Sequence, residues 1–476
     1  MARTSPPYLK VPNELWDVVF SYDFRGKDFL VLSIINKFFN LAVEPSLYSN
    51  FTWLPKLCTA LPVLRELKDR DLRTHTRGRR RNHIELPREY FSHQTPYLLL
   101  QAILDSPRRA GYLKTVKILA PTSEVGVFWD SYHAREYGFS EAHFETCKKT
   151  IDQLPPAYHS YWIDGLYKGK LEVILGVLLL RLTGLENIEI RLRDVPATRS
   201  AVIYALSCPL ASRPHHYRYP NVKTFKLTTD YVHGLPLNAM LAHKEEDIFQ
   251  TYQPVPSIFN YKKLKNLSMT HCSPGNYLEG RLNSAMNLTK LTLRDSCINE
   301  NQLATFLAAT PHLEDLDVEL FYDDTIPQYL DCVKLKSALL LVHKTLKRLV
   351  LDITVHFDLL NWSLPWAVQG PMGDMKAFTA LRYLDIPLKL YATEIYQASQ
   401  SASLESWSEQ RIDYLGQRMP DGLEWFGIRV CGKDSMSYEP HYHVQWCVEA
   451  YLRNSGVKRI VYVEDPWGED YDTDGN

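Results

Sequence analysis

One spacing of apolar residues recurs ten times between Leu113 and Tyr462: an apolar residue, two others, an apolar residue, one other, and an apolar residue. The clearest copies begin at Leu264, Leu288, Leu313, Leu346 and Leu381, and looser copies begin at Leu113, Leu185, Val222, Leu423 and Val457. The last two apolar positions alternate with mostly polar ones, as a strand buried on one face requires. The pattern therefore predicts ten short strands, each entered just after the first apolar position.

The segments between these strands are helical where a pattern is visible. Residues 299–302 form a start that resembles a capping box, and three apolar residues follow on one helical face. Residues 406–409 predict another helix start, and 96–104 predict a helix that covers the open end of the first repeat. Strand followed by helix, repeated, predicts an α/β protein with parallel strands joined by helical crossovers.

The steps between copies are uneven. The copies at 264, 288 and 313 lie 24 and 25 residues apart, within the roughly 20–29 residues usual for such repeats. The steps from 222 to 264 and from 381 to 423 are 42 residues each, so they must contain insertions. The 72-residue step after 113 predicts a degenerate unit with an insertion over 120–184.

The first fifty residues follow a different pattern. Leu15, Val18, Val19 and Tyr22 share one helical face, and Asp28 can cap a second helix that carries Phe29, Leu32, Ile35 and Phe39 before Pro45. Short helices of this kind bury little surface alone, so their apolar face needs a covering. Docking on a partner and packing against the following domain both satisfy that need.

The residues of this segment resemble a known family. The runs that carry the resemblance are Pro12-Asn-Glu-Leu15, Val19-Phe-Ser-Tyr22, Lys27-Asp-Phe-Leu-Val-Leu32, Asn36-Lys-Phe-Phe39 and Pro45-Ser-Leu-Tyr48. Residues 8–48 are thus similar to the F-box common in fungal proteins, and the tenfold motif resembles the leucine-rich repeat. The fold that this resemblance implies is a three-helix F-box followed by an irregular solenoid, with strands on the concave face and helices on the convex face.

F-box followed by leucine-rich repeats is the layout of substrate receptors of SCF ubiquitin ligases. The resemblance implies a Skp-type adaptor as partner, a cullin reached through it, and a protein target held by the repeats. The adaptor-facing residues would be Pro12, Leu15, Val19, Leu32 and Ile35. Where the family usually has Tyr-Leu-Asp-Pro, this chain has the longer and more polar Tyr22-Asp-Phe-Arg-Gly26.

The chemistry of such a receptor lies on other subunits, so the expectation is a protein without enzymatic activity, cofactor or metal. The alternative is a leucine-rich-repeat interaction scaffold whose F-box recruits no cullin. Either way, the expected organisation is an F-box over 8–50, a linker with a basic loop over 51–96, repeats over 97–463 and an acidic disordered tail over 464–476.

A target would lie on the outward strand positions of the repeats. Those singled out are Lys290, Arg294, Asp315, Asp317, Glu319, Tyr383, Trp425 and Arg429. Tyrosine, tryptophan and arginine concentrate binding energy at interfaces, which favours the last group. Two alternatives remain open: the charges neutralise each other as cross-strand pairs, and the aromatic residues pack under a long loop.

Composition limits the classes of function. The chain has 476 residues, with 54 basic against 55 acidic side chains, which argues against non-specific nucleic-acid binding. Its eight cysteines contain no CxxC pair, so free thiols in a reducing compartment are expected. The N-terminus lacks the apolar run that is typical of a signal peptide, and no apolar stretch is long enough to span a bilayer. A cytoplasmic or nuclear location is the expectation.

Two further clusters have alternative interpretations. The basic run 77–81 is either a solvated loop or an import signal or phosphate patch. His441, His443 and Cys447 could bind a metal, but their spacing is not that of a zinc site, which favours structural roles.

Overall fold

The computed structural model describes residues 44–53, 94–119, 139–154, 159–193, 201–207, 219–230, 258, 261–270, 287–296, 298–323, 330–356, 368–370, 372–387, 390, 419–429 and 459–463. The chain divides into two compact units. Unit 1 comprises Met1–Val222 and Thr229–His243, and unit 2 comprises Lys223–Thr228 and Lys244–Asn476. The predicted F-box helices lie outside the described residues, except that residues 44–47 are helical.

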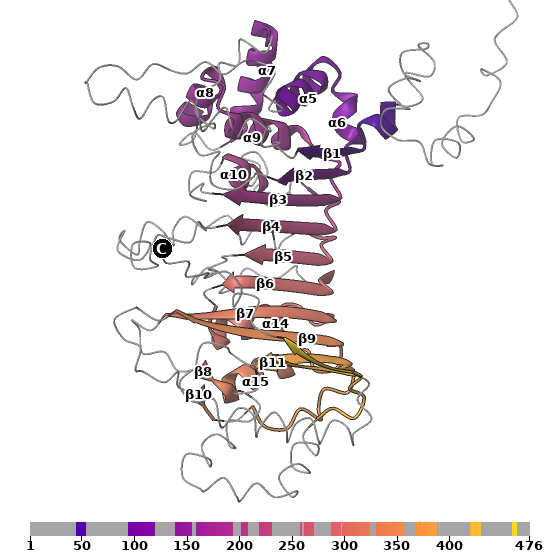
Figure 1. Cartoon of the computed structure of the whole chain (residues 1–476). Helices are drawn as coiled ribbons and strands as arrows, with labels where there is room; N and C mark the ends of the chain where they lie inside the picture. Colours follow the sequence, from indigo (N-terminus) through magenta and orange to yellow (C-terminus); the bar gives the residue numbers. More distant parts are fainter. Residues whose placement is uncertain are drawn as a thin grey trace, which may run out of the picture. The chain divides into compact units, whose positions relative to one another are not determined.

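Unit 1 contains three parallel strands among its described residues, in the order β1 (Asn50–Trp53), β2 (Thr115–Leu119) and β3 (Asn187–Arg193) (Figure 1). Its described helices are α5 (Gln94–Asp105), α6 (Arg108–Tyr112), α7 (Glu141–Ile151), α8 (His159–Tyr167), α9 (Leu171–Arg181) and α10 (Ala201–Ser207). Helix α9 is apolar on nearly every side and is buried from Val173 to Leu180. A helix of this composition belongs in a core.

Unit 2 contains a longer parallel sheet. Its described strands, in spatial order, are β4 (Thr224–Asp230), β5 (Asn266–Thr270), β6 (Lys290–Ser296), β7 (Asp315–Asp323), β9 (Arg348–His356), β11 (Tyr383–Pro387), β12 (Trp425–Arg429) and β13 (Arg459–Val463). A separate pair joins β8 (Leu330–Asp331) to β10 (Val368–Gln369). Helices α14 (Glu300–Ala308) and α15 (Cys332–Leu340) contact each other. The class is α/β, with an open parallel sheet accompanied by helices.

The apolar spacing predicted the strand positions correctly. Ten strands begin two residues after the first apolar position of their copy of the motif. They are β2 to β7, β9 and β11 to β13. Inward residues such as Leu291 and Leu316 have no exposed surface, and they are register partners on β6 and β7. The helix expected after residues 299–302 is also present. It is α14, which begins at Glu300, and Asn299 and Gln302 form a reciprocal capping box at its start.

A repeated hydrogen-bond arrangement stacks one repeat on the next. The carbonyl oxygen just after the first apolar position accepts the two backbone N–H groups at the corresponding positions of the following repeat. The accepting residues are Ser49 and Lys114 in unit 1 and Lys223, Lys265, Thr289, Glu314, Lys347 and Arg382 in unit 2, with distances of 2.8–3.2 Å. This geometry satisfies backbone groups that the turn would otherwise leave without partners.

The sequence analysis missed strand β1. It pairs with β2 in parallel, so the repeat at Leu113 is not the first rung. Tyr48, Phe51 and Trp53 have the same spacing as the apolar motif, and Phe51 and Trp53 are buried. An aromatic version of the motif was therefore present inside the segments assigned to the F-box and the linker. Among the described helices, none is long and apolar enough to cross a membrane.

Candidate interaction surface

The outward residues of the unit 2 strands form one surface, called here the polar face. Parallel register places Lys290, Asp315, Arg348, Tyr383 and Trp425 in a single row across five neighbouring strands. Adjacent strands lie about 4.8 Å apart, so each side chain in this row can contact the next. The sequence-predicted residues are thus brought together wherever the structure describes their side chains.

Ion pairs connect the charged half of the row. Asp315 binds Lys290 at 2.7 Å and Arg348 at 2.8 Å, so one carboxylate links strands on both sides of β7. Asp317 binds Arg294 at 2.7 Å, and Arg348 lies 3.7 Å from its other oxygen. The proposed alternative for these charges, cross-strand neutralisation, is therefore what the geometry shows.

Asp317 is more buried than its outward strand position suggests. Only 8% of its surface is accessible. Arg294 and Arg348 contact it from the two flanking strands, and these long side chains remove it from water. A partly desolvated carboxylate between two guanidinium groups is coupled to its neighbours, so its replacement affects more than one side chain.

The aromatic half of the row is a continuous stack. The guanidinium carbon of Arg348 lies 4.9 Å from the centre of the Tyr383 ring. On β12, the Trp425 ring lies parallel to the Tyr383 ring, with centroids 3.7 Å apart and an interplanar angle of 9°. A cation against an aromatic face and a stacked aromatic pair are each worth on the order of 1 kcal/mol. Tyr383 and Trp425 are both partly exposed.

The electrostatics of the row favour charged Arg348. Burial alone would lower the pKa of Arg348, but the hydrogen bond from its guanidinium to Asp315, the charges of Asp315 and Asp317, and Tyr383 raise it above the ordinary value. Arg348 therefore stays charged throughout the physiological range and holds the acidic and aromatic halves together. The site prediction omitted Arg348, although the repeat register alone places it between Asp315 and Tyr383.

The structure describes some of the remaining predicted residues and not others. Glu319 lies on β7 opposite Asp352 and is partly exposed. Arg429 ends β12, where it is the register partner of Pro387, and its side chain lies outside the described part of the structure. The adaptor-facing residues Pro12, Leu15, Val19, Leu32 and Ile35 lie outside the described residues, as do the basic run 77–81 and the cluster around His441.

In unit 1, residues 44–48 contact helix α6. The buried carboxylate of Glu44 binds Arg108 and Arg109, each at 2.7 Å. Arg109 also lies over the ring of Tyr48, 5.0 Å from its centre. Two ion pairs, called here the clamp, thus hold the helical residues 44–47 against α6.

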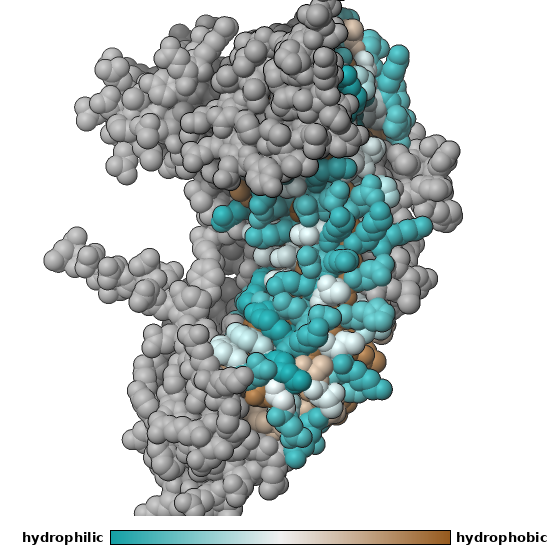
Figure 2. Space-filling view, turned by 90° about the vertical axis from the view of Figure 1, so that its right-hand side faces the viewer, coloured by the Kyte–Doolittle hydropathy of each residue, from teal (hydrophilic) through white to brown (hydrophobic). Residues whose placement is uncertain are grey.

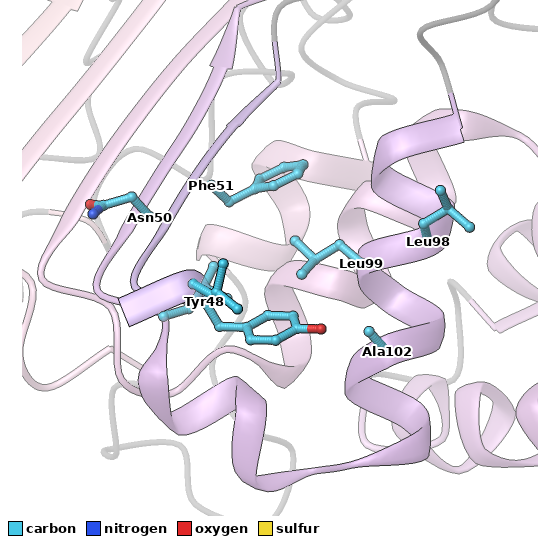
Figure 3. A pocket seen from close by; sticks show the side chains of 8 residues that line it. Tyr48, Asn50, Phe51, Leu98, Leu99 and Ala102 are labelled. Atoms are coloured by element: carbon cyan, nitrogen blue, oxygen red, sulfur yellow. The ribbon is translucent and has the colours of Figure 1, made fainter. Parts of the chain in front are cut away.

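An apolar pocket of about 250 Å³ lies beside this clamp. Figure 3 shows Phe51 and Tyr48 on one side of the pocket, facing Leu99 and Ala102 of α5. Leu98 on the same helix is 53% exposed. The residues that line the pocket carry no charged side chain.

Both cysteines among the described residues are buried. Burial raises the pKa of the Cys147 and Cys332 thiols to about 12, so both stay protonated and unreactive at neutral pH. Within the same residues, no group of three or more His, Cys, Asp or Glu side chains could hold a metal ion.

No protein-family model matches the chain, and no curated protein matches it in sequence.

Proposed function

We propose that this chain is the substrate-recognition subunit of an SCF-type E3 ubiquitin ligase. In this proposal residues 8–48 are a three-helix F-box that binds a Skp-type adaptor, and the sheets of both units belong to a leucine-rich-repeat solenoid. The observation that carries the proposal is the agreement between motif and strand: ten strands begin two residues after ten copies of the motif. The stacked carbonyl hydrogen bonds support the same repeat architecture.

The role of such a subunit is proximity. The repeats hold a protein target while the adaptor, through a cullin, brings a ubiquitin-loaded enzyme close to it, which raises the effective concentration of the reacting groups. The chain then needs no catalytic residue, cofactor or metal of its own. The polar face supports this role, because its partly exposed Tyr383 and Trp425 are the residue types that anchor interfaces.

A second candidate is a repeat scaffold that binds the adaptor without a cullin. The observation in its favour is the loop 22–26, which is longer and more polar than in the family. Co-purification separates the two candidates. Recovery of both adaptor and cullin with the tagged chain supports the ligase subunit, recovery of the adaptor alone supports the scaffold, and recovery of neither contradicts both.

A further inference from the structure

A second charged surface of unit 2 adjoins the row of ion pairs and shares Lys290 with it, whose ammonium group binds Asp315 at 2.7 Å. Residues 219–228 and 261–270, which include most of β4 and all of β5 with their preceding turns, contain five lysines and no aspartate or glutamate. With Lys290 of β6, the lysine patch comprises Lys223, Lys226, Lys262, Lys263, Lys265 and Lys290, and all six residues are exposed. Within these described residues lysines are concentrated, although the net charge of the whole chain is near zero.

The backbone holds these lysines on adjacent rungs. The amide of Lys265 donates to the carbonyl oxygen of Lys223 at 2.8 Å, so the two residues occupy equivalent positions of consecutive repeats. Lys226 is the register partner of Ser268, and Lys290 is the register partner of Asn266. The patch therefore extends across three strands, roughly 10 Å of sheet plus the reach of the side chains.

The surroundings of the patch are polar. Figure 2 views the molecule from the side on which β4 to β6 begin in Figure 1, and the coloured residues there are predominantly hydrophilic. Thr224, Asn266 and Asn287 contribute hydroxyl and amide groups near the lysines, and the Asn287 amide donates to the carbonyl oxygen of Lys262. This combination of cations and neutral hydrogen-bonding groups suits an anionic chain that remains partly hydrated.

We infer that the lysine patch binds an acidic, Asp/Glu-rich segment of a partner protein in extended conformation. Separate ammonium groups on successive rungs match carboxylates spaced along a chain, whereas a single phosphate is typically held by arginine forks that converge on it. The described aromatic residues of the same strands and turns, Tyr219, Phe225 and Tyr261, are buried, so bases would find no surface on which to stack. These two features favour an acidic peptide over a phosphate or a nucleic acid.

This inference deepens the target-binding half of the proposed function and rests on it for the identity of the partner as a target. It does not depend on the F-box, because the patch lies wholly within unit 2. Binding of an acidic peptide and recovery of the adaptor are therefore separate measurements, and either can fail without the other.

The test uses the full-length protein and a fluorescent peptide of about twelve residues, alternating Asp or Glu with Ser, with binding followed by anisotropy. The informative variant is Lys262→Gln/Lys263→Gln/Lys265→Gln. Its matched control is Lys334→Gln/Lys336→Gln/Lys344→Gln, which removes the same charge from α15 and the turn after it. We expect the first variant to weaken binding by about tenfold or more and the control by less than about twofold.

Added salt should weaken the wild-type complex, because the attraction between exposed charges is screened within about 10 Å at 0.1 M. Equal losses in the two triple variants would overturn the inference, since binding would then follow total charge alone. Tighter binding of a singly phosphorylated neutral peptide or of single-stranded RNA would also overturn it. Binding that occurs only after removal of residues 464–476 would assign the patch to the acidic end of the chain itself.

Discussion

Gly427 lies directly beneath the indole of Trp425 on β12. A Cβ atom at position 427 would come within 2.5 Å of the ring, and it would also lie 3.0 Å from the carboxyl carbon of Asp385. Glycine is thus required here by the close approach of a side chain and not by backbone conformation. The absence of a side chain at 427 lets Trp425 lie flat against the strand and stack on Tyr383.

The first prediction follows from this contact. Gly427→Ala should displace the indole from Tyr383 and destabilise the protein by about 1–3 kcal/mol, as other overpacked sites do. Trp425→Phe with and without Gly427→Ala isolates the effect in tryptophan fluorescence. An unchanged Trp425 emission spectrum and an unchanged unfolding midpoint in Gly427→Ala would contradict the packing described.

The second prediction concerns the inward and outward sides of the sheet. Leu291→Ala and Leu316→Ala should each lower the free energy of unfolding by about 2–5 kcal/mol, because each opens a cavity in the shared core. Thr292→Ala, on the polar face, should stay within about 0.5 kcal/mol of wild type. Chemical denaturation of the three variants makes the comparison, and equal losses at inward and outward positions would show that the strand register is wrong.

Asp317→Ala should not behave like Thr292→Ala. It removes the carboxylate between Arg294 and Arg348, so the expected loss is about 1–3 kcal/mol, the cost of leaving partly buried charged groups without their partner. Asp317→Asn should restore only part of that loss, since it keeps shape but not charge. A neutral effect of both substitutions in the same denaturation experiment would mean that the ion pairs contribute nothing to stability.

A further prediction concerns the start of α15. Asp331 is its N-cap, and one carboxylate oxygen accepts the amides of Val333 and Lys334, each at 3.0 Å. The amide hydrogen bond from Lys334 is the largest cause that lowers the pKa of Asp331. Asp331→Ala should destabilise the protein by about 0.5–2 kcal/mol at neutral pH.

The pH dependence of that effect has a definite sign. Because the folded-state pKa is lowered, the stabilisation is fully present above the unfolded-state value of about 3.9 and is lost as pH falls through the folded-state pKa. The difference in unfolding free energy between wild type and Asp331→Ala should therefore shrink in acid. A difference that stays constant from neutral pH to below the folded-state pKa would rule out this role for the carboxylate.

Target recognition on the polar face gives another prediction. Trp425→Ala combined with Arg429→Ala should weaken target capture by more than about tenfold, or about 1.4 kcal/mol, while adaptor binding is unchanged. Quantitative comparison of the proteins that co-purify with each variant is the measurement. If this variant loses nothing while deletions within 120–184 lose every target, the insertion and not the polar face binds the target.

The sequence predicted the strands well because a strand buried on one face leaves a strict apolar alternation, and the ten copies preserve it. It missed β1 because Tyr48, Phe51 and Trp53 replace the expected aliphatic residues and overlap the end of the F-box resemblance. Among the candidate site residues, the row from Lys290 to Trp425 follows from repeat register. The burial of Asp317 does not follow, because it depends on how two long arginine side chains from neighbouring strands fold over one carboxylate.

The same limit applies to Gly427 and Glu44. A glycine in a strand has several structural meanings, and only the orientation of the Trp425 ring shows which one applies here. Glu44 lies in a segment that the resemblance assigns to the F-box, while its partners Arg108 and Arg109 are more than sixty residues away. No local pattern joins residues at that separation, so the clamp becomes visible only in three dimensions.

The most direct test of the proposed function is co-purification of the tagged full-length chain with and without Leu15→Asp/Ile35→Asp. A carboxylate on an apolar docking face costs several kcal/mol when it is buried, so the variant should lose the Skp-type adaptor and the cullin together. The unfolding transition of unit 2 should be preserved, because unit 2 contains only residues after 222. Recovery of adaptor and cullin with wild type only is the predicted result, and equal recovery with a folded variant would contradict the F-box assignment.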